Sequence, residues 1–266
     1  MGVWTSLYKR EDRQDKKNYR PITTLTAVDK IFEHLLHRQV SEHYKQNLYH
    51  KMTAYRKKNS CETTLLRHVE DWKKAIDSKD QVLALSMDMT KAFDSLCPAL
   101  IVKKLEAYGF SNEALELMRS FFHKRANRVK IGGTTSTWKE MIRGCPQGSS
   151  FGPMLWNIFQ NDMAFHVKNS NLSMYADDHQ LYITGRNIQE AKKKLEAEAK
   201  VAMSWYSDSF LLANPDKFQA ITIKSRGQST DGSERDITLD INGYTVQSTS
   251  ETKLLGVYFD DLSVNI

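Results

Sequence analysis

Two adjacent acids stand between two short β-rich segments of this 266-residue chain. Asp177 and Asp178 lie between residues 172–174 and 180–184, and a third acid, Asp88, follows another such segment. A tight turn with two carboxylates, facing a carboxylate at the end of a neighbouring strand, can hold two divalent cations about 4 Å apart. Ions at that spacing activate an attacking oxygen and stabilise a leaving one. The pattern therefore predicts a metal-dependent phosphoryl-transfer site.

The donor types favour Mg²⁺ as the metal, with Mn²⁺ as a substitute. Three carboxylates without histidine or thiolate match a hard cation and serve zinc poorly. An Asx-rich hairpin turn would also explain Asp177 and Asp178, because Asp tolerates turn geometry. Their apolar flanks, however, should draw the turn towards a buried sheet face, where like charges raise one another's pKa unless a cation compensates.

Composition sets broad limits on the class of protein. Lys and Arg number 38 against 32 acids, giving a net charge of +6, and 40% of the residues are hydrophobic. Such a mild basic excess fits a nucleic-acid partner and an ordinary solvated surface about equally well. The three cysteines, Cys61, Cys97 and Cys145, have no metal-type spacing and indicate a reducing compartment. No apolar run approaches the roughly 20 residues that span a bilayer, so no membrane partner is expected.

The remaining pattern predicts a mixed order of helices and strands. Thr26 stands at a helix N-cap position, with Asp29 in the first turn and apolar residues at helical spacing over 28–40. Lys192, Lys193 and Lys194 are interpreted as a solvated helix face. No repeat or linker marks a boundary, so we expect subdomains of one unit. Helices are predicted over 26–40, 65–76, 98–108, 111–124, 154–159 and 188–209. Hairpins are predicted over 128–141, turning at the paired glycines 132–133, around Asp177 and over 237–246. Strands are predicted over 82–87, 218–223 and 254–259, a basic strand or loop over 1–20, and a polar loop over 226–235.

A glycine-rich loop is the third chemical element. Residues 143–153 read RGCPQGSSFGP, and glycines bracket Gln147. Glycines permit close approach of the backbone to a planar ligand, and helix N-termini favour anions. A Gly/Pro loop that simply enters a core helix explains the same residues.

These motifs together resemble a known family. AFD at residues 92–94, PQG at 146–148 and YADD at 175–178 occur in the order of the reverse transcriptase palm, and NYRPI at 18–22 is similar to the upstream finger motif. The strings NYRPITTL, GCPQGSSFGPMLWNIFQNDM, YADDHQLY, ANPDKF and KLLGVYFD resemble the polymerase of non-LTR, LINE-type retrotransposons. Ser150 and Phe151 depart from the small or aliphatic pair usual in that family, which bears on template fit.

The resemblance implies an α/β (α+β) right-hand polymerase with an antiparallel palm sheet. The whole chain, residues 1–266, would be one reverse transcriptase domain, with fingers over about 1–80 and 98–145 and palm over 81–97 and 146–266. Thumb helices are expected after Phe259, so the thumb is expected to be missing. Neither an endonuclease nor a zinc-knuckle segment is recognised in the sequence.

The resemblance also implies a reaction and roles for single residues. The enzyme would be an RNA-directed DNA polymerase that joins dNTPs to a DNA primer on an RNA template, acting in cytoplasm and nucleus as a retrotransposon ribonucleoprotein. Asp88, Asp177 and Asp178 would bind two Mg²⁺ ions, and Lys217 would neutralise the leaving pyrophosphate. Arg20 and Lys9 would clamp the triphosphate of the incoming nucleotide, and Phe93 would be the steric gate against its 2′-OH. Gln147 and Gly148 would contact the nascent base pair and template, and Leu255 and Gly256 would lie in the primer grip.

Two alternatives remain open. A domesticated or degenerate fragment could bind RNA through the same groove without polymerising, although the intact acids count against it. A group II intron maturase or a telomerase-like enzyme would share the chemistry and differ in its partners.

Overall fold

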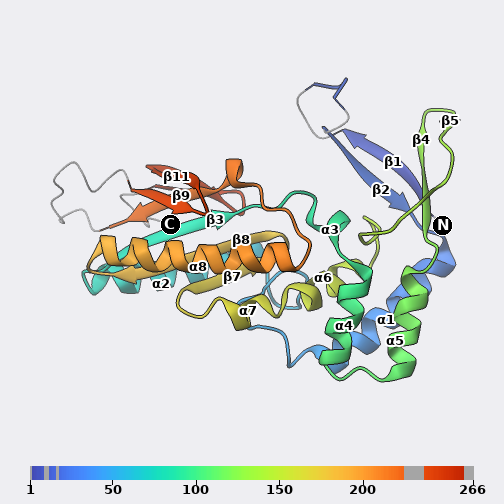
Figure 1. Cartoon of the computed structure of the whole chain (residues 1–266), viewed down its shortest axis with the longest axis horizontal. Coiled ribbons are helices and arrows are strands. Elements are labelled where there is room, and N and C mark those ends of the chain that lie inside the picture. Colours follow the sequence, from blue (N-terminus) through green and yellow to red (C-terminus); the bar gives the residue numbers. More distant parts are fainter. Residues whose placement is uncertain (1, 9–11, 16–17, 225–236, 261–266) are drawn as a thin grey trace. The chain divides into compact units, whose positions relative to one another are not determined.

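The computed structural model describes every residue except 1, 9–11, 16–17, 225–236 and 261–266 (Figure 1). Contacts divide the chain into two compact units, which are Met1–Leu48 with Lys91–Gln160, and Tyr49–Thr90 with Asn161–Ile266. Each unit is therefore built from two separated segments. Residues 49–80, which the sequence placed with the fingers, belong to the same unit as residues 81–90. The assignment of these units to fingers and palm stays a prediction.

In the described part of the first unit, a small sheet has the strand order β2-β1-β4-β5, and β6 also pairs with β4. Strands β1 and β2 pair antiparallel, whereas β1 and β4 run parallel. The predicted glycine hairpin joins β4 to β5, and Gly132 adopts a φ of +57° that favours glycine. The second arm of that hairpin is two short strands rather than one. The strands are β1 (Gly2–Tyr8), β2 (Tyr19–Thr24), β4 (Ala126–Ile131), β5 (Thr134–Thr135) and β6 (Lys139–Glu140).

The described residues of this unit also form five helices, and the first begins where the sequence predicted. Thr26 accepts a hydrogen bond from the Asp29 N–H, and the Asp29 carboxylate accepts one from the Thr26 N–H, which is a complete capping box. The apolar residues of this helix divide between two faces. Leu36 and Val40 are buried, whereas Val28, Ile31, Phe32 and Leu35 are 40–76% exposed. The helices are α1 (Ala27–Tyr44), α3 (Ala92–Ser95), α4 (Pro98–Ala107), α5 (Asn112–Phe122) and α6 (Gly152–Gln160).

The described residues of the second unit form a six-stranded sheet in the order β10-β11-β9-β3-β8-β7. Neighbouring strands are antiparallel except for the β11–β9 pair, which is parallel. The central strand β3 is buried along almost its whole length, as its run of apolar residues predicts. The strands are β3 (Gln81–Met87), β7 (Asn171–Tyr175), β8 (Asp178–Gly185), β9 (Gln219–Ile223), β10 (Thr238–Ile241) and β11 (Tyr244–Thr249).

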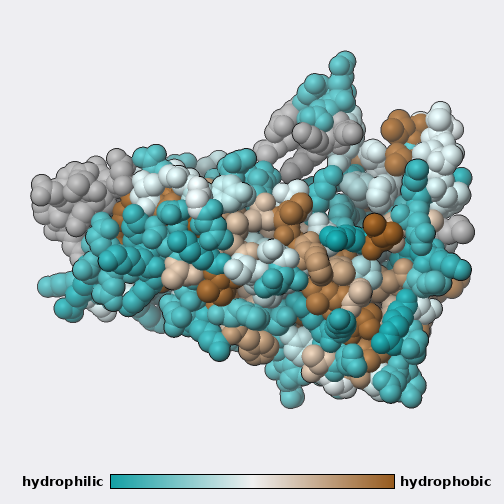
Figure 2. Space-filling model, viewed as in Figure 1, coloured by the Kyte–Doolittle hydropathy of each residue, from teal (hydrophilic) through white to brown (hydrophobic). Residues whose placement is uncertain are grey.

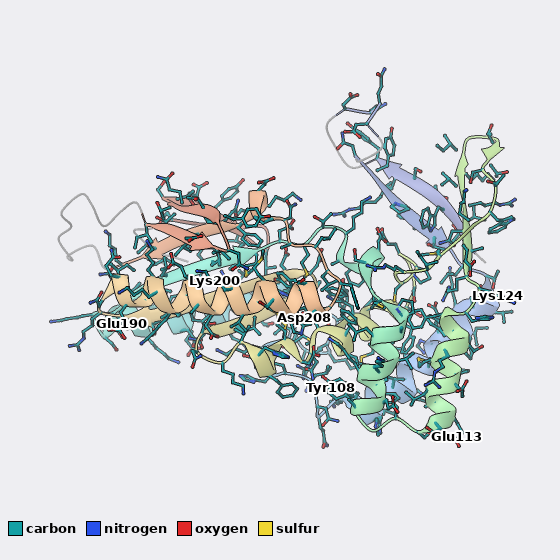
Figure 3. The ribbon with its side chains drawn as sticks, in the orientation of Figure 1. Tyr108, Glu113, Lys124, Glu190, Lys200 and Asp208 are labelled. Carbon is teal, nitrogen blue, oxygen red and sulfur yellow. The ribbon has the colours of Figure 1, made fainter. Side chains whose placement is uncertain are left out.

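Two long helices cover the two faces of this sheet (Figure 1). Helix α2 (Cys61–Asp77) packs its buried residues, including Trp72, against Val82, Ala84 and Tyr182. Helix α8 (Ile188–Asp208) packs against β8, β3 and β10 on the other face. Its outer side is largely hydrophilic in Figure 2, and Glu190 and Asp208 mark its two ends in Figure 3. Exposed Lys193 and Lys194 confirm the predicted solvated face. The short helix α7 (Met163–His166) also contacts α8.

The C-terminal segment differs from the sequence prediction. Residues 254–259 were expected to form one strand, but they contain the turn of a hairpin between β12 (Glu251–Leu254) and β13 (Val257–Asp260). The chain reverses at Leu255 and Gly256, whose φ values of +47° and +92° no continuous strand can contain. The predicted polar loop 226–235 lies outside the described residues. Among the described helices, none has both the length and the apolar character that crossing a bilayer requires.

Candidate active site

The paired acids stand at the tight turn between β7 and β8. Tyr175 pairs with Asp178 across the hairpin, so Ala176 and Asp177 are the two residues that reverse the chain. Ala176 has a φ of +56°, in the left-handed region that tight hairpin turns use. The predicted strand–turn–strand around Asp177 is therefore confirmed, and the turn presents two consecutive carboxylates at one end of the sheet.

The register of β3 against β8 brings the third acid to the same end. Met87, the last residue of β3, pairs with His179, so continuing the antiparallel register places Asp88 beside Asp178. Burial, together with the negative charges of Asp177 and Asp88, raises the pKa of Asp178 to about 6. The three predicted acids thus share one sheet end and interact electrostatically.

Asp88 is held by the segment that precedes β9. Its Oδ2 accepts hydrogen bonds from Asn214 Nδ2 at 3.1 Å and from Lys217 Nζ at 3.3 Å. The Asp88 carbonyl oxygen also accepts from the Asn214 N–H at 2.9 Å. Lys217, which was predicted to meet the leaving pyrophosphate, is thus bound to an acid of the site. No role for Asn214 was predicted, although it lies in the ANPDKF string that resembles the family.

The donor set suits a hard divalent cation, although it does not form a complete metal site. No three His, Cys, Asp or Glu side chains in the described part of the chain are close enough together to hold a metal ion by themselves. The chemistry of Asp88, Asp177 and Asp178 nevertheless fits Mg²⁺, which commonly takes one or two carboxylates together with water and substrate phosphates. The mutual repulsion of these acids is also what a bound cation would relieve.

Two buried residues, His179 and Tyr206, contact each other next to the acid turn, and neither was predicted from the sequence. His179 follows Asp178 directly, and its Nδ1 lies 2.9 Å from the hydroxyl of Tyr206 on α8. Burial lowers the pKa of His179 to about 3, so the ring is neutral at physiological pH. Burial and the charge of Asp88 raise the pKa of Tyr206. Helix α8 is therefore coupled directly to the strand that carries Asp178.

The segment before α2 also lies near the acids. Burial, followed by the charges of Asp177 and Asp178, raises the pKa of Tyr55. Tyr55 and Lys58 both adopt positive φ values, of 61° and 66°, which turn this segment sharply. Lys57 and Lys58 are exposed. This basic turn carries no motif of its own, so only the tertiary contacts relate it to the site.

In the first unit, the glycine-rich loop packs against the AFD segment. Gln147 Nε2 donates to Asp94 Oδ1 at 2.9 Å, and the Gln147 carbonyl accepts from the Thr23 N–H at 2.7 Å. Burial raises the pKa of Asp94, although the hydrogen bond from Gln147 opposes that shift. A Cβ at Gly144 would approach the Asp94 backbone within 2.8–3.0 Å, which explains this glycine. Gly148, exposed and with a φ of +104°, adjoins Thr23.

The two residues that depart from the family pattern have a structural explanation. Phe151 is fully buried, and its ring lies edge-on to Phe121 at a centroid distance of 5.7 Å. The Ser150 N–H donates to Oε2 of the buried Glu33 at 2.9 Å, and the Ser149 hydroxyl donates to the same oxygen at 2.8 Å. Phe151 is therefore a core residue whose side chain is not available to a ligand at the surface.

The other predicted residues are distributed over both units. Phe93 is half-buried, with its ring 5.2 Å from that of Trp156, and Arg20 is exposed on β2. Leu255 and Gly256 form the turn of the β12–β13 hairpin. Lys9 lies outside the described residues. The structure thus brings Asp88, Asp177, Asp178 and Lys217 together in one unit, and it links Gln147 to the AFD segment and to β2 in the other.

Comparison with known proteins identifies relatives along nearly the whole chain. The family model described as reverse transcriptase (RNA-dependent DNA polymerase) matches residues 8–259. The probable RNA-directed DNA polymerase from transposon BS of Drosophila melanogaster is 24% identical over 258 residues, which cover 93% of this chain and 28% of that protein. The RNA-directed DNA polymerase from mobile element jockey of the same species is 24% identical over 92% of this chain and 27% of its own length. The chain thus spans about a quarter of the length of these relatives.

A solved structure has a similar fold. The apo telomerase of Candida tropicalis, truncated from its C-terminal domain, aligns with a TM-score of 0.66 and 13% sequence identity. The alignment covers 99% of this chain and 54% of that one. At this identity the likeness concerns the fold alone, and it confirms the predicted mixed α/β architecture.

Proposed function

The chain belongs to the reverse transcriptase (RNA-dependent DNA polymerase) family, and we propose on this basis that it is the polymerase core of a non-LTR retrotransposon. It would extend a DNA primer on an RNA template from dNTPs. One observation supports this proposal above the others, namely that Asp88, Asp177 and Asp178 meet at one end of the sheet. A carboxyl with a pKa raised to about 6 at a sheet end has a cost in stability, which is typical of a functional site.

The three acids would hold two Mg²⁺ ions, or Mn²⁺ in their place. When bound, these ions would activate the primer 3′-OH and neutralise charge on the transferred phosphate. Asn214 holds the Asp88 carboxylate in place through its amide. Lys217 brings an ammonium group to the sheet end, where negative charge accumulates during the reaction, and this supports its assignment to the leaving pyrophosphate.

The remaining assignments concern the incoming nucleotide and the nucleic acid. Arg20 and Lys9 would bind the triphosphate, and Phe93 would exclude the ribose 2′-OH. Gln147 and Gly148 would contact the nascent base pair and template. The hydrogen bonds of Gln147 to Asp94 and Thr23 support a fixed position for this loop. Leu255 and Gly256 would contact the primer, and Gly256 is exposed at the hairpin turn while the partly buried Leu255 packs against the hydrophobic core. Action in cytoplasm and nucleus as a ribonucleoprotein also stays a prediction.

Primer extension on an RNA template tests the proposal against its alternative. The 266-residue chain should add dNTPs to an annealed DNA primer in Mg²⁺, and chelation with EDTA should stop the reaction. The alternative of RNA binding without polymerisation predicts template–primer binding with no extension in Mg²⁺ or Mn²⁺. A chain extended at its C-terminus should be tested in parallel, because synthesis by the longer chain alone would show that the added segment is required.

A further inference from the structure

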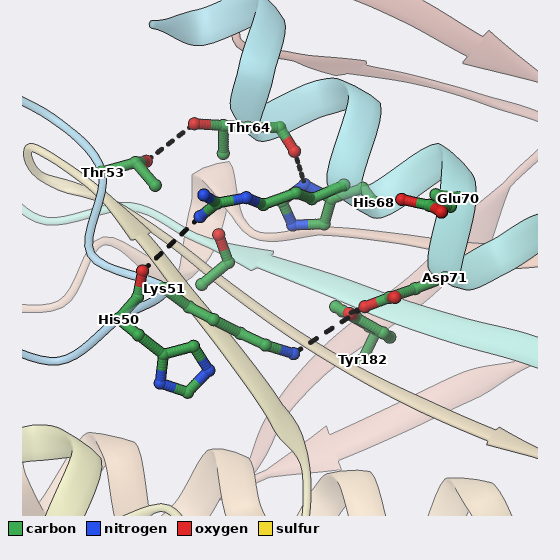
Figure 4. Close-up of a pocket in the computed structure, with 10 residues that line it drawn as sticks. His50, Lys51, Thr53, Thr64, His68, Glu70, Asp71 and Tyr182 are labelled. Atoms are coloured by element: carbon green, nitrogen blue, oxygen red, sulfur yellow. Dashed lines mark hydrogen bonds and ion pairs between the residues drawn. The ribbon is translucent and has the colours of Figure 1, made fainter. Parts of the chain in front are cut away.

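A small polar cavity lies between α2, the segment before it and the β7–β8 hairpin (Figure 4). It has a volume of about 210 Å³, and none of the three acids of the candidate active site lines it. That volume is below the range of roughly 300–1,000 Å³ typical of drug-sized ligands. The cavity can therefore enclose only part of a drug-sized ligand, such as one ring, and the rest of the ligand would lie at the open mouth. Its residues divide into a charged mouth and an uncharged, buried floor.

The mouth of the cavity is basic. The Arg67 side chain is exposed, and within the described part of the chain it makes no ion pair, only a 3.5 Å hydrogen bond to the His50 carbonyl. Burial and the charges of Lys51, Arg67 and Arg56 lower the pKa of the exposed His50. A cluster of positive charge that disfavours a further proton favours an anion instead.

The acids near the mouth already have cationic or hydrogen-bonding partners. Asp71 accepts a short hydrogen bond from the Tyr182 hydroxyl and lies 3.8 Å from Lys51 Nζ. Glu70 pairs with Lys74 at 3.1 Å. Because these carboxylates have partners, the guanidinium of Arg67 is the cation left to attract a ligand.

The floor contains polar groups without partners. His68 is only 3% exposed, and its Nδ1 lies 2.7 Å from the Thr64 carbonyl oxygen (Figure 4). A carbonyl can only accept, so Nδ1 carries the proton and Nε2 is an acceptor. Among the described residues, Nε2 has no partner. Burial lowers the pKa of His68, which keeps the ring neutral, while the nearby Gln180 amide opposes that shift. Within the described part of the chain no hydrogen bond joins His68 to Gln180, and both amide atoms of Gln180 also lack partners there.

Unpaired buried polar groups of this kind destabilise a fold, so a ligand or ordered water is expected to satisfy them. Ser173 faces Gln180 across the hairpin and adds a hydroxyl to the same floor. The site thus offers a cation for an anionic group, and below it an acceptor and a hydroxyl. A phosphate alone would use the mouth and leave the floor unsatisfied.

We propose that this cavity binds one nucleotide, with its phosphate against Arg67 and His50 and an amino-bearing base donating to Nε2 of His68. The proposal does not depend on polymerase activity. A free nucleoside monophosphate and an unpaired nucleotide within an RNA strand present the same groups to this site.

Calorimetric titration of the 266-residue chain in EDTA tests the proposal with AMP, adenosine and inorganic phosphate. AMP should bind about tenfold more tightly than either fragment, because only AMP engages mouth and floor together. Equal affinity for AMP and phosphate, or no binding of AMP, would overturn it. Competition with unstructured oligoadenylate then separates the two sources. Displacement of AMP assigns the site to a strand, and retention of AMP assigns it to the free nucleotide.

Matched variants locate the binding. Arg67→Gln should weaken AMP about tenfold and leave adenosine unchanged. Lys73→Gln removes the same charge from an exposed position of the same helix outside the cavity, and it should bind AMP normally. Ser173→Ala should weaken both AMP and adenosine. The Asp177→Asn/Asp178→Asn double variant should retain AMP, and its loss there would place the nucleotide at the candidate active site instead.

Discussion

The ammonium nitrogen of Lys217 lies 3.3 Å from Oδ2 of Asp88, although 129 residues separate them. The family resemblance gave these two residues different roles in one reaction: Asp88 would bind metal, and Lys217 would neutralise the leaving pyrophosphate. The structure joins them directly, and Asn214 donates to the same carboxylate oxygen.

Replacing Lys217 should affect catalysis far more than stability. Both partners of its ion pair are substantially exposed, so Lys217→Gln should change the free energy of unfolding by less than about 1 kcal/mol. If Lys217 neutralises the leaving pyrophosphate, single-turnover extension should slow by about a hundredfold. Lys200→Gln, at an exposed position of α8, is the control. Equal extension rates for the two variants would remove Lys217 from the reaction.

Replacing either of the paired acids should also impair catalysis, but replacing Asp178 should change stability as well. Asp177→Asn or Asp178→Asn should abolish extension while template–primer binding, measured by fluorescence anisotropy, stays nearly unchanged. In EDTA, Asp178→Asn should also raise the free energy of unfolding, because it removes one of three repelling charges. The Asp178 carboxyl is crowded by neighbouring atoms but keeps contact with solvent, which screens the repulsion, so we expect a gain of only about 1 kcal/mol in urea denaturation. A variant that extends primers at the unmutated rate would contradict the metal assignment.

Loss of the Gln147 amide should produce a pH-dependent loss of stability. Burial raises the pKa of Asp94, and the hydrogen bond from Gln147 lowers it again. Gln147→Ala therefore raises the folded-state pKa further above the unfolded value. The folded variant then holds its proton to higher pH, so its stability falls more as pH rises through that interval. Urea denaturation should show a deficit of about 1–2 kcal/mol at pH 7 that shrinks towards pH 4. A deficit independent of pH would mean that Asp94 is not the partner that matters.

Phe93 should control the choice of sugar. Its half-buried ring is supported by Trp156 at a centroid distance of 5.2 Å, which limits its freedom to move aside. Phe93→Val should therefore admit ribonucleotides, because the smaller side chain leaves room for the 2′-OH. Single-nucleotide incorporation of dCTP and CTP measures the ratio, with Phe121→Val as an aromatic-to-aliphatic control elsewhere in the same unit. Unchanged discrimination by the Phe93 variant would remove it from the gate role.

Several structural features could be predicted from the sequence alone, because they depend on residues close together in the chain. The Thr26–Asp29 capping box, the glycine hairpin and the turn at Asp177 each depend on residues a few positions apart, so their spacing carries the signal. The motif order likewise identified the family and the three acids. Such features need no knowledge of which strands become neighbours.

Only the tertiary structure decided how distant segments use their polar groups. The register of β3 against β8 brings Asp88 to Asp178, and the contact of residues 212–214 with residues 88–90 brings Lys217 to Asp88. The partnership of Gln147 with Asp94, the buried His68 and the coupling of His179 to Tyr206 arise in the same way. Pairing energies between residues more than 25 positions apart depend on burial and strand register, which no local spacing encodes. The reversal at Leu255 and Gly256 is the remaining case, because a glycine permits a turn but the pairing of β12 with β13 is what selects it.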